Sequence, residues 1–239
     1  MVARSRGSVA RRVGVSGVGV VALAMLAGSG APAAAAPPPP TAAHLTVDAT
    51  MVRARPSERA RVVGRLRDLR PDFRLRIVRV LGRSGDRAGG TWYRVALPGR
   101  PNGRTGFVRA EALRLRTRPR AVVIVRRGAR RLEVRIDGRR VLRTRVAVGK
   151  PGAETPLGRF HVTASFRPTA PVLGRWAIET SAYSRISDWP GGGIVGIHGT
   201  RSPELLGQAV SHGCVRVADP VIRRVAHLAP PGTPVVIVR

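Results

Sequence analysis

Cys214 is the only cysteine in the 239-residue sequence, and two histidines lie close enough along the chain to activate it. His212 lies two residues before the thiol, and His198 lies sixteen residues before it. A free thiol with a pKa near about 8.5 is mostly protonated at neutral pH, so a cysteine nucleophile needs a base to take its proton. An imidazole can take that proton and later return it to a leaving amine. We therefore predict that Cys214 is a nucleophile and that His198 is its general base and acid.

The residues around the cysteine read Ser211-His212-Gly213-Cys214-Val215-Arg216. By base rate, a lone cysteine is about as often a small core hydrophobe as a catalyst. The polar serine and histidine and the glycine beside it argue against a core position. Glycine lets the backbone approach a ligand closely, so the N–H groups of Gly213 and Cys214 could form an oxyanion hole.

A zinc site is the main chemical alternative to a thiol nucleophile. One cysteine and two histidines could supply three ligands, but a structural zinc site needs four protein ligands. The spacing also matches no common zinc motif. We therefore predict no metal and no other cofactor.

The elements that position these residues belong to a C-terminal part, residues 118–239, that is predicted to be mostly β. Ala121–Val125 is an apolar strand, and the alternating run 131–136 is followed by Asp137-Gly138, which suits a two-residue hairpin turn. Further strands are predicted at 140–148, 160–165, 194–197 and 233–238. One helix is expected after Asp219, with Asp219 as its N-cap and Pro220 at its first position.

Residues 45–117 show short strands broken by turns and are predicted to form a small β-barrel or sandwich. Four segments of this region carry a resemblance to a known domain: 52–57, Val63-Gly64, Trp92-Tyr93-Arg94-Val95 and Gly106-Phe107-Val108. On these segments the domain resembles the bacterial SH3-like domain, which implies binding of wall peptide or glycan. A spacer without a ligand is the alternative reading. Residues 37–44, which begin with four prolines, are predicted to be a linker.

The first 36 residues are arranged like a secretory signal peptide. Four arginines precede an apolar stretch, Val13–Ala27, and small residues follow through Ala36. An uncleaved membrane anchor is the alternative, although the stretch is short for a membrane span. We therefore expect an exported protein. The wall ligands that the SH3-like resemblance implies would place it in the cell envelope, secreted to the outer side of the membrane and located in the cell wall.

The charge of the chain is strongly basic, with 43 Lys and Arg against 13 Asp and Glu, a formal net charge of +30. Such a charge favours an anionic neighbour, and anionic wall polymers are one candidate partner. Nucleic acid is not expected, because the arginines are spread along the chain and no zinc-finger or basic-zipper spacing accompanies them. The sequence does not determine the oligomeric state.

The residues 211–216, together with Ile197-His198-Gly199-Thr200, resemble the active-site signature of the L,D-transpeptidase catalytic domain. Val148-Gly149-Lys150, Thr155-Pro156-Leu157-Gly158-Arg159-Phe160 and Gly232-Thr233-Pro234-Val235-Val236 match other segments of that family in the right order. The resemblance covers the whole second domain. It implies a β-rich fold with one or two short helices that acts on peptidoglycan stem peptides.

The resemblance also implies a role for each matching residue. Cys214 would attack a stem-peptide carbonyl and form a thioester, with His198 as base and acid. His212, with the backbone N–H groups of Gly213 and Cys214, would shape the oxyanion hole. Arg216 would hold a substrate carboxylate, with a structural ion pair as its alternative.

The remaining predicted contacts to substrate come from Ser211, Gly199 and Thr200. Some members of the family have a serine directly after the base histidine; this chain has Gly199, so any orienting group must be a backbone carbonyl or a distant side chain. The stretch 167–193 is a candidate flap over the site. Its Trp176 and Trp189 could equally belong to the core, and we expect this for Trp176.

The predicted activity is an exported peptidoglycan L,D-transpeptidase, a cysteine-dependent acyltransferase that cross-links stem peptides through a Cys214 thioester. Water as the acceptor would instead give an L,D-carboxypeptidase-type hydrolase, because both reactions use the same acyl-enzyme. A catalytically silent wall-binding protein is a third reading, against which the presence of both Cys214 and His198 argues.

Overall fold

The computed structural model describes residues 41–116, 119–186 and 192–239. The predicted signal peptide (1–36), the four-proline run and Trp189 lie outside the described residues. No helix in the described part of the chain has the length and hydropathy to cross a membrane.

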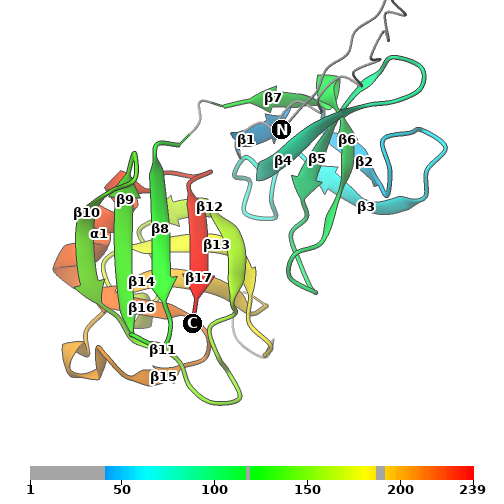
Figure 1. Cartoon of the computed structure of the whole chain (residues 1–239). Helices are drawn as coiled ribbons and strands as arrows, with labels where there is room; N and C mark the ends of the chain where they lie inside the picture. The colour runs from blue at the N-terminus through cyan, green and yellow to red at the C-terminus, as the bar shows by residue number, and fades with distance from the viewer. Residues whose placement is uncertain (1–40, 117–118, 187–191) are drawn as a thin grey trace, which may run out of the picture. The chain divides into compact units, whose positions relative to one another are not determined.

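Residues 41–115 form a seven-stranded sheet in the order β3-β2-β6-β5-β4-β1-β7 (Figure 1). Its strands are β1 (Thr41–Leu45), β2 (Ala49–Arg53), β3 (Val62–Arg67), β4 (Ile77–Gly85), β5 (Thr91–Ala96), β6 (Thr105–Arg109) and β7 (Leu113–Leu115). The core of this sheet includes Val52, Leu66 and Val108. The first strand begins four residues before the predicted start of the domain, inside the predicted linker. Its small alanines carry little strand signal, and pairing with β4 and β7 decides its structure.

Residues 121–238 form an eight-stranded sheet in the order β10-β9-β8-β17-β12-β13-β14-β16. Its strands are β8 (Ala121–Arg126), β9 (Arg131–Ile136), β10 (Arg139–Arg145), β12 (Gly158–Phe166), β13 (Ala177–Tyr183), β14 (Ile194–Thr200), β16 (Val215–Ala218) and β17 (Pro234–Val238). A two-stranded parallel sheet pairs β11 (Val148–Gly149) with β15 (Ala209–Ser211). Three short 3-10 turns are η1 (Ala110–Ala112), η2 (Pro171–Leu173) and η3 (Pro203–Leu205). The predicted mostly-β fold class is confirmed.

The hairpin between β9 and β10 follows from its turn residues. Asp137 and Gly138 have φ angles of 49° and 79°. Two positive φ angles give a turn whose twist matches that of the flanking strands, and glycine and aspartate adopt them at low cost. The predicted hairpin is therefore confirmed.

The eight-stranded sheet bends at β12, because the two halves of this strand pair with different neighbours. Gly158 to His161 pair with β17, whereas Val162 to Phe166 pair with β13. Figure 1 shows the consequence: β8, β9, β10 and β17 run in front, and β13, β14 and β16 cross behind them. The side chains between the two halves form the core of this domain, which includes Val123, Ile178 and Ile197.

The prediction of a flap over 167–193 was wrong for part of this stretch. Ala177–Tyr183 forms β13, which lies inside the sheet between β12 and β14. The buried residues Ile178, Thr180 and Ala182 alternate along this strand, but one of them is polar. The apolar alternation that would predict a strand is therefore weak in the sequence. Trp176 packs against the core, partly buried, as expected.

The single α-helix of the described residues, α1 (Asp219–Leu228), confirms the predicted helix but not its predicted cap. Ala218 occupies the N-cap position, and no side chain caps the helix. The Asp219 carboxylate instead accepts the backbone N–H of Arg175 at 3.0 Å. The cap prediction was wrong because a distant segment takes the carboxylate that the local sequence would have used.

Candidate active site

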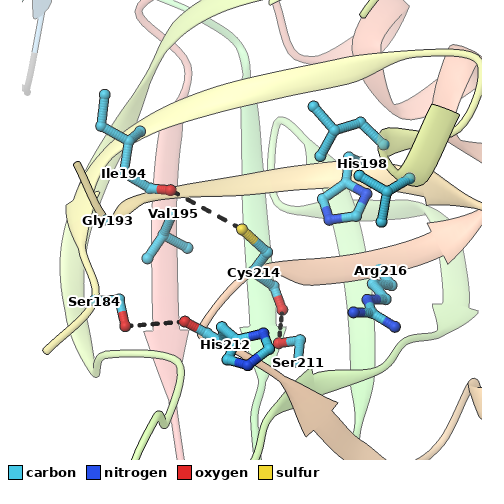
Figure 2. A pocket seen from close by; sticks show the side chains of 11 residues that line it. Ser184, Gly193, Ile194, Val195, His198, Ser211, His212, Cys214 and Arg216 are labelled. Carbon is cyan, nitrogen blue, oxygen red and sulfur yellow. Dashed lines mark hydrogen bonds between the residues drawn. The ribbon is translucent and has the colours of Figure 1, made fainter. Parts of the chain in front are cut away.

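The predicted base lies on β14, and the predicted nucleophile lies directly before β16, the adjacent parallel strand. Pairing of β14 with β16 places Ile197 beside Val215 and His198 beside Arg216. Cys214 directly precedes β16, so the thiol emerges where that strand begins. Both side chains line one narrow cleft of about 20 Å³, about the space of one water molecule (Figure 2). The cleft is lined by Val172, Leu173, Ser184, Gly193, Ile194, Val195, His198, Ser211, His212, Cys214 and Arg216.

The Cys214 thiol is held by the backbone of β14. Its sulfur accepts the N–H of Gly196 at 3.3 Å, and it faces the carbonyl of Ile194 at 3.9 Å (Figure 2). Burial raises the pKa of the thiol above its ordinary value, and the Gly196 hydrogen bond opposes this only in part. The resting thiol is therefore protonated at neutral pH, and attack on a carbonyl requires a base.

His198 is oriented by the carbonyl of the next residue. The imidazole is 4% exposed, and its Nδ1 lies 2.7 Å from the Gly199 carbonyl oxygen. A carbonyl only accepts hydrogen bonds, so Nδ1 carries the proton and Nε2 keeps the lone pair that a base needs. Burial lowers the pKa of His198 to about 4. The residue is therefore a neutral imidazole at rest.

Gly196 shows how close the two groups lie. A Cβ built on Gly196 would stand 3.9 Å from the Cys214 sulfur and 3.9 Å from Cδ2 of His198. Glycine at this position leaves open the space between the thiol and the imidazole. The arrangement allows proton transfer between a thiol and a neutral base without a metal.

The orienting group that the sequence left unassigned is the Gly199 carbonyl. Asp219 explains why residue 199 is a glycine: a Cβ there would lie 1.9 Å from the Asp219 Oδ1 atom. The carboxylate that accepts the Arg175 N–H thus fills the space that a serine side chain would take.

The predicted oxyanion hole is only partly as the sequence suggested. The Gly213 N–H donates to the Ser211 hydroxyl at 3.2 Å, so it is already engaged. Within residues that the structure describes, no protein atom accepts the Cys214 N–H. This N–H is therefore the better placed of the two for a developing oxyanion. His212 is exposed and lines the cleft, and its predicted part in the hole stays a prediction.

Arg216 lines the same cleft from β16. Its Nε atom is buried and has no hydrogen-bond partner in the described residues. A buried donor without a partner costs free energy, so a ligand oxygen at this position would be favoured. The predicted role in holding a carboxylate stays a prediction, with this orphaned donor as its support.

The other predicted contact residues lie less close to the cleft. Gly199 and Thr200 do not line it, and the Thr200 hydroxyl accepts the N–H of Ser202 at 3.1 Å. Ser211 lines the cleft but is 1% exposed, and its hydroxyl donates to the Cys214 carbonyl. Direct contact of these residues with substrate stays a prediction.

Sequence reasoning missed two polar residues that contact the nucleophile loop, 211–214. Ser184 follows β13 and donates to the His212 carbonyl at 3.0 Å, and Thr155 donates to the Gly213 carbonyl at 2.9 Å (Figure 2 shows the first). Thr155 begins one of the segments that match the family, residues 155–160, but the sequence assigned it no role. Ser184 has no local signal, since only the folding of β13 against β14 brings it here.

The zinc alternative has no supporting geometry in the described ranges. Across residues 41–116, 119–186 and 192–239, no three His, Cys, Asp or Glu side chains gather closely enough to hold a metal ion.

Two comparisons place this site in a known family. A model of the L,D-transpeptidase catalytic domain matches residues 120–237. YqjB of Bacillus subtilis (strain 168), whose name assigns it to the L,D-transpeptidases, is 31% identical over 128 residues, which are 48% of this chain and 69% of YqjB. The chain belongs to the L,D-transpeptidase catalytic domain family.

Another relative with an L,D-transpeptidase name is YkuD of Bacillus subtilis (strain 168). It is 31% identical over 112 residues, 47% of this chain and 62% of YkuD, so the match spans less than two thirds of that relative. An L,D-transpeptidase structure from Mycobacterium tuberculosis H37Rv matches 69% of this chain and 90% of that chain, with 15% identity and a TM-score of 0.46. Neither comparison bears on the predicted SH3-like resemblance of residues 45–117, which stays a prediction.

Proposed function

We propose that the chain is an exported peptidoglycan L,D-transpeptidase that forms a thioester between Cys214 and a donor stem peptide. The observation that carries the proposal is the presence of a thiol and an oriented base in one cleft. The Gly199 carbonyl holds His198 as the tautomer whose Nε2 can accept a proton, and the imidazole shares the cleft with the thiol.

The first half-reaction makes the acyl-enzyme. The His198 Nε2 atom takes the Cys214 proton as the sulfur attacks the donor carbonyl, and the Cys214 N–H stabilises the oxyanion. The tetrahedral intermediate collapses, the bond from the carbonyl carbon to the donor's terminal residue breaks, and His198 gives its proton to the leaving amine. Because both groups are neutral at rest, the charge separates only as the reaction proceeds.

The second half-reaction transfers the acyl group. An amine of a second stem peptide attacks the thioester, His198 takes its proton, and the sulfur leaves and recovers that proton. Water in place of the amine gives the hydrolase outcome. Residues 211–216 serve both reactions, so the acceptor must be identified by its product.

Purified protein with tetrapeptide donor and acceptor stem peptides tests this function, with mass analysis of the products. We expect cross-linked dimers from the wild type and none from Cys214→Ala. Free tripeptide with no dimer would identify the hydrolase. Dimers formed equally by Cys214→Ala would contradict the mechanism. A wild type that forms no product but sediments with sacculi would favour the wall-binding protein.

Export is part of the proposal, and it is supported by the composition of residues 1–36 rather than by any described structure. Fractionation of producing cells tests it. We expect the protein outside the membrane, with a mature N-terminus after the apolar stretch Val13–Ala27. A full-length chain in the cytoplasm would contradict export.

The predicted anionic partner has a specific candidate surface. Four arginines line one hollow of the catalytic domain: Arg167, Arg175, Arg201 and Arg223. Asp219 pairs with Arg175 at 3.9 Å, and no other ion pair of the four occurs in the described residues. We propose that this arginine hollow contacts anionic wall polymer.

A further inference from the structure

Three consecutive carbonyls of the nucleophile loop each accept a hydrogen bond from a side-chain hydroxyl. Ser184 donates to the His212 carbonyl at 3.0 Å, Thr155 to the Gly213 carbonyl at 2.9 Å, and Ser211 to the Cys214 carbonyl at 2.6 Å. We call these three residues the hydroxyl set. Ser211 is close to its acceptor in the sequence, but Thr155 lies 58 residues and Ser184 lies 28 residues from the residue whose carbonyl it contacts.

All three members of the hydroxyl set are buried. Thr155 is 0% exposed, Ser184 3% and Ser211 1%. A buried hydroxyl without a partner is unfavourable, so the surrounding protein favours each of these hydrogen bonds. The direction of the Thr155 bond is also fixed. Its oxygen accepts the Gly149 N–H at 2.9 Å, which leaves the hydroxyl proton for the Gly213 carbonyl.

Because the peptide bond is planar, a hydrogen bond to the carbonyl of one residue also fixes the direction of the N–H group of the next residue. In a planar trans peptide, the carbonyl of one residue points opposite to the N–H of the next. The bond from Thr155 to the Gly213 carbonyl therefore sets the direction of the Cys214 N–H. In the same way, the bond from Ser184 to the His212 carbonyl sets the Gly213 N–H, which meets the Ser211 hydroxyl.

Gly213 has the conformation that makes such control necessary. Its φ is +116°, a region that glycine enters readily, and its two neighbouring peptide planes would otherwise rotate easily. A Cβ at this position would stand 2.8 Å from the Ser184 hydroxyl oxygen, so the hydroxyl packs directly against the glycine. A flexible glycine beside the nucleophile needs external contacts to hold one orientation.

We infer that Thr155 and Ser184 are positioning residues for acyl transfer, which act by fixing the peptide planes of 212–214 so that the Cys214 N–H faces the developing oxyanion. The inference rests on the proposed acyl-enzyme mechanism at Cys214. It assigns Thr155 the larger effect, because its acceptor carbonyl shares a peptide plane with the Cys214 N–H.

Two small reagents separate this role from a structural one. With p-nitrophenyl acetate, the sulfur bonds to the acetyl carbon, p-nitrophenolate leaves with its electron pair, and His198 takes the thiol proton; an oxyanion forms on the way. With iodoacetamide, the sulfur bonds to the methylene carbon, iodide leaves with the electron pair of the broken carbon–iodine bond and His198 takes the thiol proton; no oxyanion forms. A misdirected Cys214 N–H should slow the first reaction and spare the second.

The variant Thr155→Val keeps the shape of the side chain and removes the hydroxyl. We expect the acetylation rate of full-length protein to fall about 10- to 100-fold, less than the loss of a whole oxyanion donor, and alkylation to stay within about threefold. Thr155→Ser, which keeps a hydroxyl, should recover most of the acetylation rate. Thr233→Val is the matched control, because Thr233 is equally buried and its hydroxyl has no partner in the described residues.

The inference is overturned if Thr155→Val acetylates at the wild-type rate, or if alkylation falls as much as acetylation. Should Thr155→Val fail to fold, Ser184→Ala provides the decision: we expect acetylation to fall at least about fivefold with alkylation unchanged, and equal losses would reject the idea. Cys214→Ala separates the two proposals. If Cys214→Ala still becomes acetylated, the proposal that Cys214 is the nucleophile is wrong. If Cys214→Ala is not acetylated but Thr155→Val and Ser184→Ala react at the wild-type rate, the nucleophile proposal stands and only the positioning role is rejected.

Discussion

The Nδ1 atom of His198 lies 2.7 Å from the carbonyl oxygen of Gly199, the residue directly after it. This backbone carbonyl fixes the tautomer of the imidazole without a side chain, and in the proposed mechanism it would take the place of the third member of a catalytic triad. Both residues lie on β14. The predicted base is consequently oriented by the same strand that carries it.

Replacement of Gly199 by serine should damage the protein, although some members of the family have serine after the base histidine. The new Cβ would stand 1.9 Å from the Asp219 Oδ1 atom. We expect Gly199→Ser to lower the free energy of unfolding by about 1–3 kcal/mol, measured by urea denaturation, as other overpacking changes do. The double variant with Asp219→Ala should recover part of the loss. Gly82→Ser is the control, because a Cβ at Gly82 meets nothing within 4 Å; equal losses in both glycine variants would contradict the steric explanation.

The buried His198 should make the protein less stable in mild acid. Burial lowers its pKa to about 4 in the folded state, so the unfolded chain takes up a proton first as the pH falls below about 6.5. The contribution to stability is complete above pH 6.5 and is lost between about pH 6.5 and pH 4. Between pH 7 and pH 5 the free energy of unfolding should fall by about 2 kcal/mol because of this one residue.

Urea denaturation of His198→Gln at pH 7 and pH 5 measures this contribution. We expect the variant to lose about 2 kcal/mol less than the wild type over that interval. Replacement of the exposed His227 by glutamine is the matched control and should leave the wild-type pH dependence unchanged. An identical pH dependence in all three proteins would contradict a buried neutral imidazole at position 198.

Arg216 should contribute to the binding of a charged donor, in addition to the effect of its positive charge on the site, which opposes the raised pKa of Cys214 and adds to the lowered pKa of His198. Its buried Nε atom has no partner in the described residues, and its side chain lines the cleft. We expect Arg216→Gln to raise KM for a tetrapeptide donor about 10- to 100-fold, the range expected for a lost charged hydrogen bond. Acetylation by neutral p-nitrophenyl acetate, which has no carboxylate for the arginine to hold, should fall much less than the KM for the tetrapeptide rises. A similar fall with both substrates would instead indicate a structural role for the arginine.

The arginine hollow should account for a specific share of the binding to anionic polymer. We expect the triple variant Arg167→Gln, Arg201→Gln, Arg223→Gln to bind poly(glycerol phosphate) more weakly by about 1–3 kcal/mol, or roughly 5- to 150-fold. Titration at several salt concentrations measures this, because exposed charge pairs weaken as salt rises.

The control for the arginine hollow is a triple variant with the same loss of charge elsewhere. Arg114, Arg116 and Arg139 are exposed and suit this purpose when replaced by glutamine. Equal weakening by both triple variants would show that the net charge of +30, and not the hollow, attracts the polymer.

The sequence by itself determined the chemistry-bearing residues and much of the local structure. A lone cysteine flanked by His212 and Gly213, with His198 upstream, contained enough chemistry to predict a thiol nucleophile and its base. The Asp137-Gly138 turn and the helix after Pro220 were also readable, because their causes are local: φ preferences and the missing N–H of proline.

Only the tertiary structure decided what holds those residues in place. The Asp219 carboxylate that excludes a side chain at residue 199 and the hydroxyls of Thr155 and Ser184 make contacts between segments far apart in the chain. The Gly199 carbonyl is a neighbour of His198 in the sequence, but only the folded structure shows that the imidazole turns toward it. The strand β13 was missed for the same reason, since its place between β12 and β14 depends on pairing rather than on its own pattern. Hydrogen bonds across distant segments form only when the core brings those segments together, and no local sequence pattern records them.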